Sequence, residues 1–155
     1  MILRALSKSY AAAGIRVGFG FGHPELIGTL RNLQNVFNMN VIGQAVGISV
    51  LAHRAAHEHN RRQIRDERER IAGELSQLGF RVTPSQASFV LARMPEGHDG
   101  RWWQAALEQK KILVAFLPDK GLESCIRVSV GTEPQMAAFL AAIRDISARL
   151  KMRAF

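Results

Sequence analysis

The residues with the clearest potential for chemistry lie near the N-terminus, in residues 3–18. Ser7 and Lys8 place a hydroxyl and an amine side by side, and Arg16 follows eight positions after the lysine. A lysine that acts as a nucleophile must be deprotonated and must reach a carbonyl group, and burial or a neighbouring cation lowers its pKa toward that state. A phosphate group is held by an arginine fork together with hydroxyl or backbone donors. Ser7, Lys8 and Arg16 supply all of these groups within one short segment.

A second arginine with this potential is Arg127. It alternates with Ile126 and Val128, so in a strand its side chain points away from its apolar neighbours, toward solvent or an anion. A guanidinium fork suits a planar carboxylate. Taken singly, each segment also has a simpler interpretation: a solvated basic junction around Lys8, and an exposed strand arginine at 127.

The pattern S-K-x-Y-x-x-A-G-x-R-x-G of residues 7–18 resembles the cofactor-lysine segment of fold-type I aminotransferases that use pyridoxal 5'-phosphate (PLP). Within these enzymes it is most similar to the histidinol-phosphate aminotransferases. C-I-R-V-S-V-G-T at residues 125–132 resembles the family's L-R-I-[ST]-x-G-T, and T-P-S-Q-A-S-F-V-L at residues 83–91 lies between the two segments. The resemblance therefore runs over essentially the whole chain and favours the functional interpretation.

The resemblance implies a role for each of these residues. Lys8 would carry PLP, Ser7 and Arg16 would bind the cofactor phosphate, and Arg127 would bind the α-carboxylate of the substrate. The implied activity is transamination between an amino acid or amino-phosphate substrate and an oxo acid, commonly 2-oxoglutarate. The resemblance also implies a homodimer when the protein is full length, and a cytoplasmic location.

Three positions depart from the family's pattern. Ala5 lies where relatives often have Thr, and Ser88 replaces an Asn near the substrate. Ala115 lies where histidinol-phosphate enzymes commonly have an Arg associated with the substrate's phosphate end. Two alternatives stay open: a related PLP-dependent phospho-amino-acid decarboxylase, and a non-catalytic α/β module that binds a partner through an exposed half-sheet. Retention of Lys8 and Arg127 argues against the module.

Full-length members of the family are more than twice as long as this chain of 155 residues. Their N-terminal part carries an Asp that pairs with the pyridine nitrogen of PLP, an aromatic that stacks on the cofactor ring and an Asn. These cannot be located here, so the chain is interpreted as the C-terminal portion of such an enzyme. We expect little or no transaminase activity from it alone.

The helices and strands that must position these residues are inferred from the sequence pattern. Their order and the resemblance predict an α/β fold with an α+β small domain. Residues 1–40 are expected to be a remnant of the large PLP-binding domain and its parallel sheet. Residues 41–78 are expected to form one long linking helix, ended by Gly79, and residues 79–155 a small βαββα C-terminal domain. The pattern predicts strands at 1–6, 16–21, 80–82, 88–92, 112–114 and 125–130, and helices at 24–35, 100–110 and 133–150.

Composition excludes several other classes of function. The net charge of +8 comes from 21 basic and 13 acidic residues, and no uninterrupted basic block or aromatic-basic motif predicts binding to nucleic acid. The charged stretch 61–70 is expected to be a solvated helix face. No apolar run approaches the roughly 20 residues of a membrane span. Cys125 is the only cysteine, as expected in a reducing cytoplasm. His53 and His57 lie four positions apart, but no third ligand completes a metal site.

Overall fold

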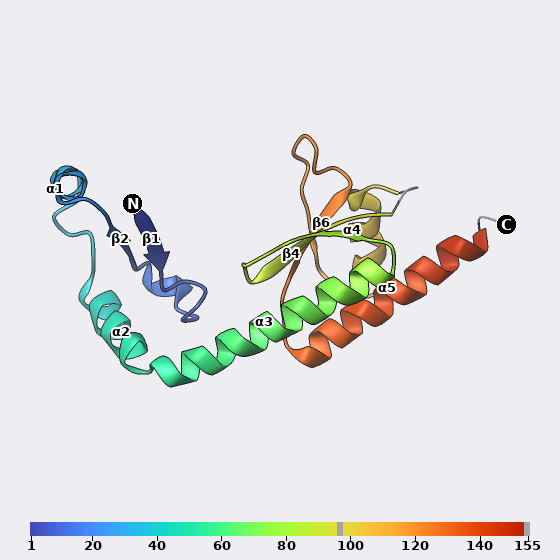
Figure 1. Ribbon diagram of the computed structural model, residues 1–155, viewed down its shortest axis with the longest axis horizontal. Coiled ribbons are helices and arrows are strands. Elements are labelled where there is room, and N and C mark those ends of the chain that lie inside the picture. Colours follow the sequence, from blue (N-terminus) through green and yellow to red (C-terminus); the bar gives the residue numbers. More distant parts are fainter. Residues whose placement is uncertain (96–97, 154–155) are drawn as a thin grey trace. The chain divides into compact units, whose positions relative to one another are not determined.

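The computed structural model describes residues 1–95 and 98–153 (Figure 1). The chain divides into two compact units, Met1–Arg61 and Arg62–Phe155, and each is described separately below. No helix among the described residues is both long enough and apolar enough to cross a membrane.

The first unit begins with a pair of antiparallel strands, β1 (Ile2–Ala5) and β2 (Gly18–Phe21). Both strands were predicted, but the expected parallel-sheet remnant is wrong for this pair. The connection between them holds only the short 3-10 helix η1 (Ala13–Ile15), whereas parallel neighbours need a crossover that is usually a full helix. Helix α1 (Pro24–Asn32) follows, and it ends earlier than predicted.

Helix α2 (Val41–Ala52) packs against the loop between these strands through two buried glycines, Gly43 and Gly47. A Cβ at Gly43 would lie 3.2 Å from the carbonyl oxygen of Ile15, and one at Gly47 would contact Leu6. Leu6 and Val17 are the buried residues at the base of the loop. Glycine costs a helix about 1 kcal/mol relative to alanine, and here the close approach that it permits offsets this cost.

The predicted single helix from 41 to 78 is wrong, because α3 (Arg54–Gln77) is separate from α2. His53 interrupts them with φ −94° and ψ 44°, and its ring nitrogen lies 2.8 Å from the carbonyl oxygen of Ser49. A side chain that binds the preceding turn in this way offers the backbone an alternative to the next helical hydrogen bond. The predicted glycine stop is confirmed: Gly79 has φ +91°, and the Phe80 N–H donates to the Leu75 carbonyl.

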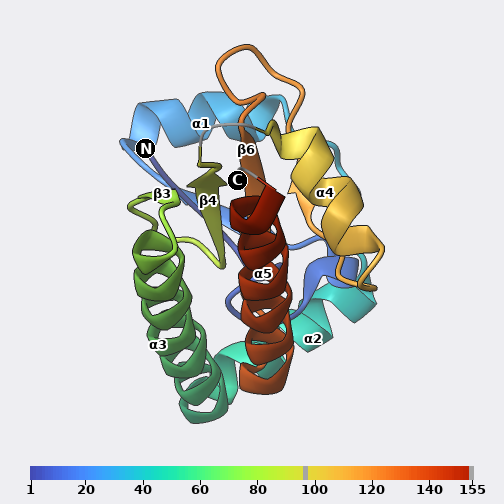
Figure 2. The same ribbon diagram turned by 90° about the vertical axis from the view of Figure 1, so that its right-hand side faces the viewer.

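The second unit is a four-stranded antiparallel sheet with helices on one face. The strand order is β3 (Arg81–Thr83), β4 (Phe89–Arg93), β6 (Cys125–Ser129) and β5 (Ala115–Phe116). Figure 2 shows α3 and α5 (Glu133–Arg153) side by side against this sheet, with α4 (Gly100–Glu108) at its edge. The core that they enclose includes Ile71, Leu75, Val90, Ala92, Trp103, Leu107, Ile126, Val128, Phe139 and Ile143.

The strand predicted at 112–114 is displaced to Ala115–Phe116. The residues just before β5 contact the end of α4 instead of β6. The Ile112 N–H donates to the Leu107 carbonyl over 3.0 Å. The Gln104 side chain also donates to the Val114 carbonyl over 3.0 Å. Pairing with β6 therefore begins only where these contacts to α4 end.

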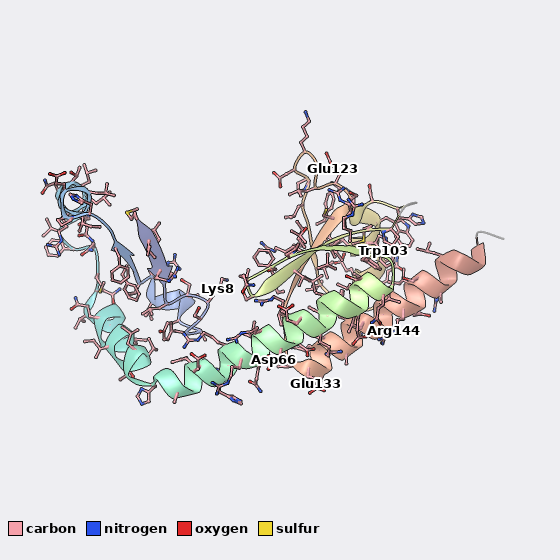
Figure 3. All side chains as sticks on the ribbon, in the orientation of Figure 1. Lys8, Asp66, Trp103, Glu123, Glu133 and Arg144 are labelled. Carbon is pink, nitrogen blue, oxygen red and sulfur yellow. The ribbon has the colours of Figure 1, made fainter. Side chains whose placement is uncertain are left out.

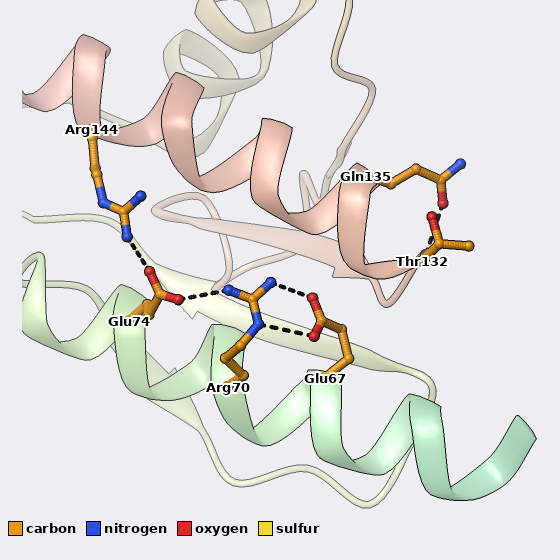
Figure 4. Close-up of polar contacts among 6 residues, drawn as sticks. All are labelled: Glu67, Arg70, Glu74, Thr132, Gln135 and Arg144. Atoms are coloured by element: carbon orange, nitrogen blue, oxygen red, sulfur yellow. Dashed lines mark hydrogen bonds and ion pairs between the residues drawn. The ribbon is translucent and has the colours of Figure 1, made fainter. Parts of the chain in front are cut away.

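A cluster of charged side chains on α3 is linked to α5 by one ion pair (Figure 4). Glu74 accepts hydrogen bonds from Arg70 on its own helix and from Arg144 on α5. Hydrogen bonding to Glu67, and then the contact with Glu74, raise the pKa of Arg70. The guanidinium groups of Arg70 and Arg144 are therefore both paired with carboxylates of the protein.

The helix starts of this unit are capped in two ways. The Asp99 carboxylate accepts from the Trp102 N–H over 2.8 Å and thereby caps the start of α4. At α5, the Thr132 N–H donates to the Gln135 side chain over 2.9 Å (Figure 4).

Candidate active site

The Lys8 turn, residues 6–17, begins where β1 ends (Figure 3). The Leu6 N–H donates to the Val17 carbonyl over 3.1 Å, which extends the β1–β2 pairing by one residue on each strand. Ser7 and Arg16 are the next residues after this last pair. The antiparallel pairing therefore brings the two ends of the predicted phosphate-binding set together, with Lys8 beside them.

Two residues without glycine's freedom have positive φ in this turn, Ala11 at 52° and Arg16 at 56°. Such conformations cost an L-residue roughly 1–2 kcal/mol. Arg16 also donates to the Ala13 carbonyl over 2.8 Å, so one of its N–H groups holds the turn and the others stay available. The backbone is thus held in a compact, partly strained loop around Lys8.

The chemistry of the turn fits a phosphorylated carbonyl cofactor. Residues 1–22 contain no Asp or Glu. The turn does contain two basic side chains, the amine of Lys8 and the guanidinium of Arg16. Among the described residues, no carboxylate forms an ion pair with either cation. Ser7 is half-buried and Lys8 is exposed. A hydroxyl, an amine and a guanidinium without competing anions suit the phosphate and carbonyl of PLP.

Arg127 lies in the second unit, on the face of the sheet opposite the helices. It pairs with Leu91 on β4 and with Ala115 on β5, and its guanidinium carbon lies 5.5 Å from the centre of the Phe89 ring. Within the described residues it has no acidic partner, so its fork is free to bind an anion. The structure also places Ala115, the position without the family's arginine, directly beside it.

Phe89 was not singled out from the sequence as a site residue, although it lies inside the segment T-P-S-Q-A-S-F-V-L. Its ring supports the Arg127 guanidinium through a cation–π contact, which fixes where the fork points. The sequence did contain a signal for this role. Side chains alternate along a strand, so Phe89 had to lie on the face opposite Val90, which faces the core.

Arg68 was also missed, because residues 61–70 were predicted to be a solvated face. It is only 6% exposed and donates to the Ala87 carbonyl over 3.1 Å. The signal lay in its spacing: Arg68 falls on the same helical stripe as Ile71 and Leu75, both fully buried. It holds the segment that precedes Ser88 and Phe89.

The structure thus groups Ser7, Lys8 and Arg16 in one unit and places Arg127 on an open sheet face of the other. Cys125, which precedes Arg127 on the same strand, is buried. Within the described part of the chain, no three His, Cys, Asp or Glu residues are grouped so that they could hold a metal ion.

Similarity to known proteins adds to this geometry. The model of the family described as aminotransferase class I and II matches residues 1–143. A histidinol-phosphate aminotransferase of Sinorhizobium fredii (strain NBRC 101917 / NGR234) is 69% identical over 153 residues, which cover 99% of this chain and 42% of the relative. The chain therefore spans less than half the length of this relative.

Solved structures give the same result. The histidinol-phosphate aminotransferase from Clostridium acetobutylicum matches with a TM-score of 0.85 and 29% identity, over 96% of this chain and 46% of that protein. The enzyme from Sinorhizobium meliloti in complex with pyridoxal-5'-phosphate matches with a TM-score of 0.79 and 26% identity, over 96% and 41%. The predicted family and fold are confirmed, and the partial coverage agrees with the expectation of an incomplete enzyme. The chain belongs to the aminotransferase class I and II family.

Proposed function

We propose that this chain carries part of the active site of a PLP-dependent aminotransferase of the histidinol-phosphate type. The observation that supports this most strongly is the Lys8 turn. Strand pairing ends just before Ser7 and Arg16 there, and the neighbouring Lys8 amine forms no ion pair with a carboxylate in the part of the chain that the structure describes. Residues 1–40 are proposed to belong to the PLP-binding domain and residues 79–155 to the small domain. The helical segment 41–78 joins them.

Each residue has a distinct proposed task. Ser7 and Arg16 bind the cofactor phosphate through one hydroxyl and the free N–H groups of one guanidinium. The Lys8 Nζ would hold the cofactor and would carry a proton to and from the substrate α-carbon. When bound, PLP supplies the electron sink for bond changes at that carbon. Arg127, supported by Phe89, binds the α-carboxylate of the substrate in a bidentate manner.

The finer expectations belong to the same proposal. The substrates are an amino acid or amino-phosphate and an oxo acid, the full-length protein is a homodimer, and it acts in the cytoplasm without binding nucleic acid or a membrane. Ala115 stands where the resembled enzymes commonly have an arginine for the substrate's phosphate group. The proposal therefore assigns residues to the amino and carboxylate groups of the substrate, and none to a phosphate group.

The test is a PLP titration of the purified chain, followed by borohydride reduction and peptide mass mapping. We expect the cofactor mass on Lys8, with little or no transaminase turnover. Lys8→Ala should lose the label, while Lys120→Ala, which changes an exposed lysine in a turn of the other unit, should keep it. Arg16→Gln should weaken PLP binding about tenfold, as expected for the loss of one charge-assisted contact.

Label spread evenly over Lys8, Lys110, Lys111 and Lys120 would contradict the assignment, because it would show that no lysine is singled out by a cofactor site. Turnover near that of an ordinary aminotransferase would contradict the expectation that this chain is inactive alone.

A further inference from the structure

Tyr10 is the only tyrosine of the chain, and it lies two residues after Lys8. Its ring meets two side chains of α3 that are one helical turn apart. The ring of His57 packs edge-on, with 5.0 Å between ring centres and an angle of 62° between planes. The guanidinium carbon of Arg61 lies 5.4 Å from the centre of the tyrosine ring. All three residues belong to the first unit.

The guanidinium of Arg61 is itself held in place. Hydrogen bonding to the Tyr10 phenol, followed by hydrogen bonding to Glu58, raises the pKa of Arg61. Glu58 lies one turn earlier on α3 and accepts from the Arg61 guanidinium. Tyr10 therefore meets a cation whose position is set by a neighbour on the same helix, so the contact does not depend on a freely rotating side chain.

Helix α2 contacts the base of the turn at Leu6, Ile15 and Val17, whereas Tyr10 makes its helix contacts two residues from Lys8. Lys8, Ser9 and Ala11 are exposed, whereas Tyr10 is half-buried. The backbone bonds of the turn are local: the Ala11 N–H donates to the Lys8 carbonyl over 3.0 Å, and the Ala12 N–H donates to the Leu6 carbonyl over 3.1 Å. Local bonds alone leave a surface turn free to open at low cost in free energy.

We infer that Tyr10 is a positioning residue, clamped between His57 and Arg61, which anchors the Lys8 turn to the start of α3. This inference rests on the proposed function insofar as the anchored lysine is the one that carries the cofactor. The aromatic ring makes the two packing contacts of the anchor, and the phenol adds the hydrogen bond to Arg61. The start of α3 thereby sets the position of the proposed cofactor lysine, although it contributes no group to the reaction.

The first readout needs no cofactor. Amide hydrogen exchange at Ala11 and Ala12 should be about 5- to 10-fold faster in Tyr10→Leu, since both ring contacts are lost. Tyr10→Phe keeps both ring contacts and loses only the phenol hydrogen bond to Arg61, so its increase should be smaller than that of Tyr10→Leu. Arg61→Gln should show a smaller increase, and the matched control Arg62→Gln, which changes the adjacent exposed arginine, should show none. Exchange at the paired amides of β1 and β2 should not change.

The second readout is PLP affinity, compared with thermal unfolding of each variant. Tyr10→Leu should weaken binding about tenfold with little change in unfolding temperature, and Tyr10→Phe should restore most of the affinity. If the wild-type chain binds no PLP, the proposed function fails, and the exchange result still supports or overturns the anchor. Unchanged exchange in Tyr10→Leu, or an equal increase throughout the first unit, would overturn it. So would faster exchange with unchanged PLP affinity, because the anchor would then not serve Lys8.

Discussion

The arginines of this chain differ in the groups that their guanidinium groups contact. Arg70 and Arg144 converge on the Glu74 carboxylate and hold two helices together. Arg127 and Arg16 have no carboxylate partner among the described residues; one rests on an aromatic ring and the other on a backbone carbonyl. The first kind is satisfied by the protein itself, and the second retains donors for an anionic ligand. This difference supports the proposed roles of Arg16 and Arg127.

A residue-scale prediction concerns Asp145 on α5. Hydrogen bonding from Lys110 lowers the pKa of this carboxyl below its ordinary value of 3.8, and Arg149 adds to the shift. A lowered folded-state pKa means that the charged form contributes stability above the unfolded pKa, and that this contribution is lost as pH falls through the folded value. Asp145→Asn should therefore lower the unfolding temperature slightly at pH 7. The gap should close as the solution is acidified from the unfolded pKa through the lower folded-state pKa.

Thermal unfolding followed by circular dichroism across that pH range measures the gap. Asp119→Asn is the matched control, because it changes an exposed carboxylate in a turn without a side-chain partner among the described residues. A gap that widens at low pH would show that the ion pairs with Asp145 are not the cause.

At the scale of elements, the end of α4 contains a correctable strain. Lys111 has φ +61°, while the Lys110 N–H and the Ile112 N–H both donate to the Leu107 carbonyl, over 2.9 Å and 3.0 Å. Glycine is the residue best suited to this left-handed position after a helix. Lys111→Gly should raise the free energy of unfolding by about 1 kcal/mol. Gln109→Gly, two residues earlier with φ −58°, should lower it by roughly 0.5–1 kcal/mol.

Urea unfolding of the two variants gives both values. Opposite signs would identify backbone conformation as the cause, and a loss of stability in both would contradict the strain at Lys111.

Local patterns in the sequence predicted most elements of this fold, because alternation, helical spacing and glycine stops are properties of short segments. The break at His53 was not predictable in this way, since it depends on a ring nitrogen that binds the Ser49 carbonyl. The displaced β5 depended on contacts of residues 112 and 114 with α4. At the candidate site, the motif identified Ser7, Lys8 and Arg16, but the roles of Phe89 and Arg68 needed the register of the sheet and the packing of α3.

At the scale of the whole chain, buried apolar side chains are distributed very unevenly. In the first unit only Leu6 and Val17 are buried hydrophobic residues among those described, whereas the second unit holds the continuous core. The apolar side chains of Leu26 and Leu30 on α1 are exposed, as are Val36 at 87% and Phe37 at 92%. A segment that buries so little apolar surface gains little free energy from folding.

This distribution predicts that residues 62–155 fold as a separate chain and that residues 1–61 do not. In the intact chain, amide exchange in the first unit should be at least about 100-fold faster than in the sheet and helices of the second. Hydrogen exchange with mass spectrometry on the intact chain and on both truncated chains measures this. Equal protection in the two units, or an unfolded 62–155 chain, would contradict it. Because the Lys8 turn lies in the weakly stabilised unit, a ligand bound there should slow exchange selectively in residues 1–61, by an amount set by its concentration relative to its Kd.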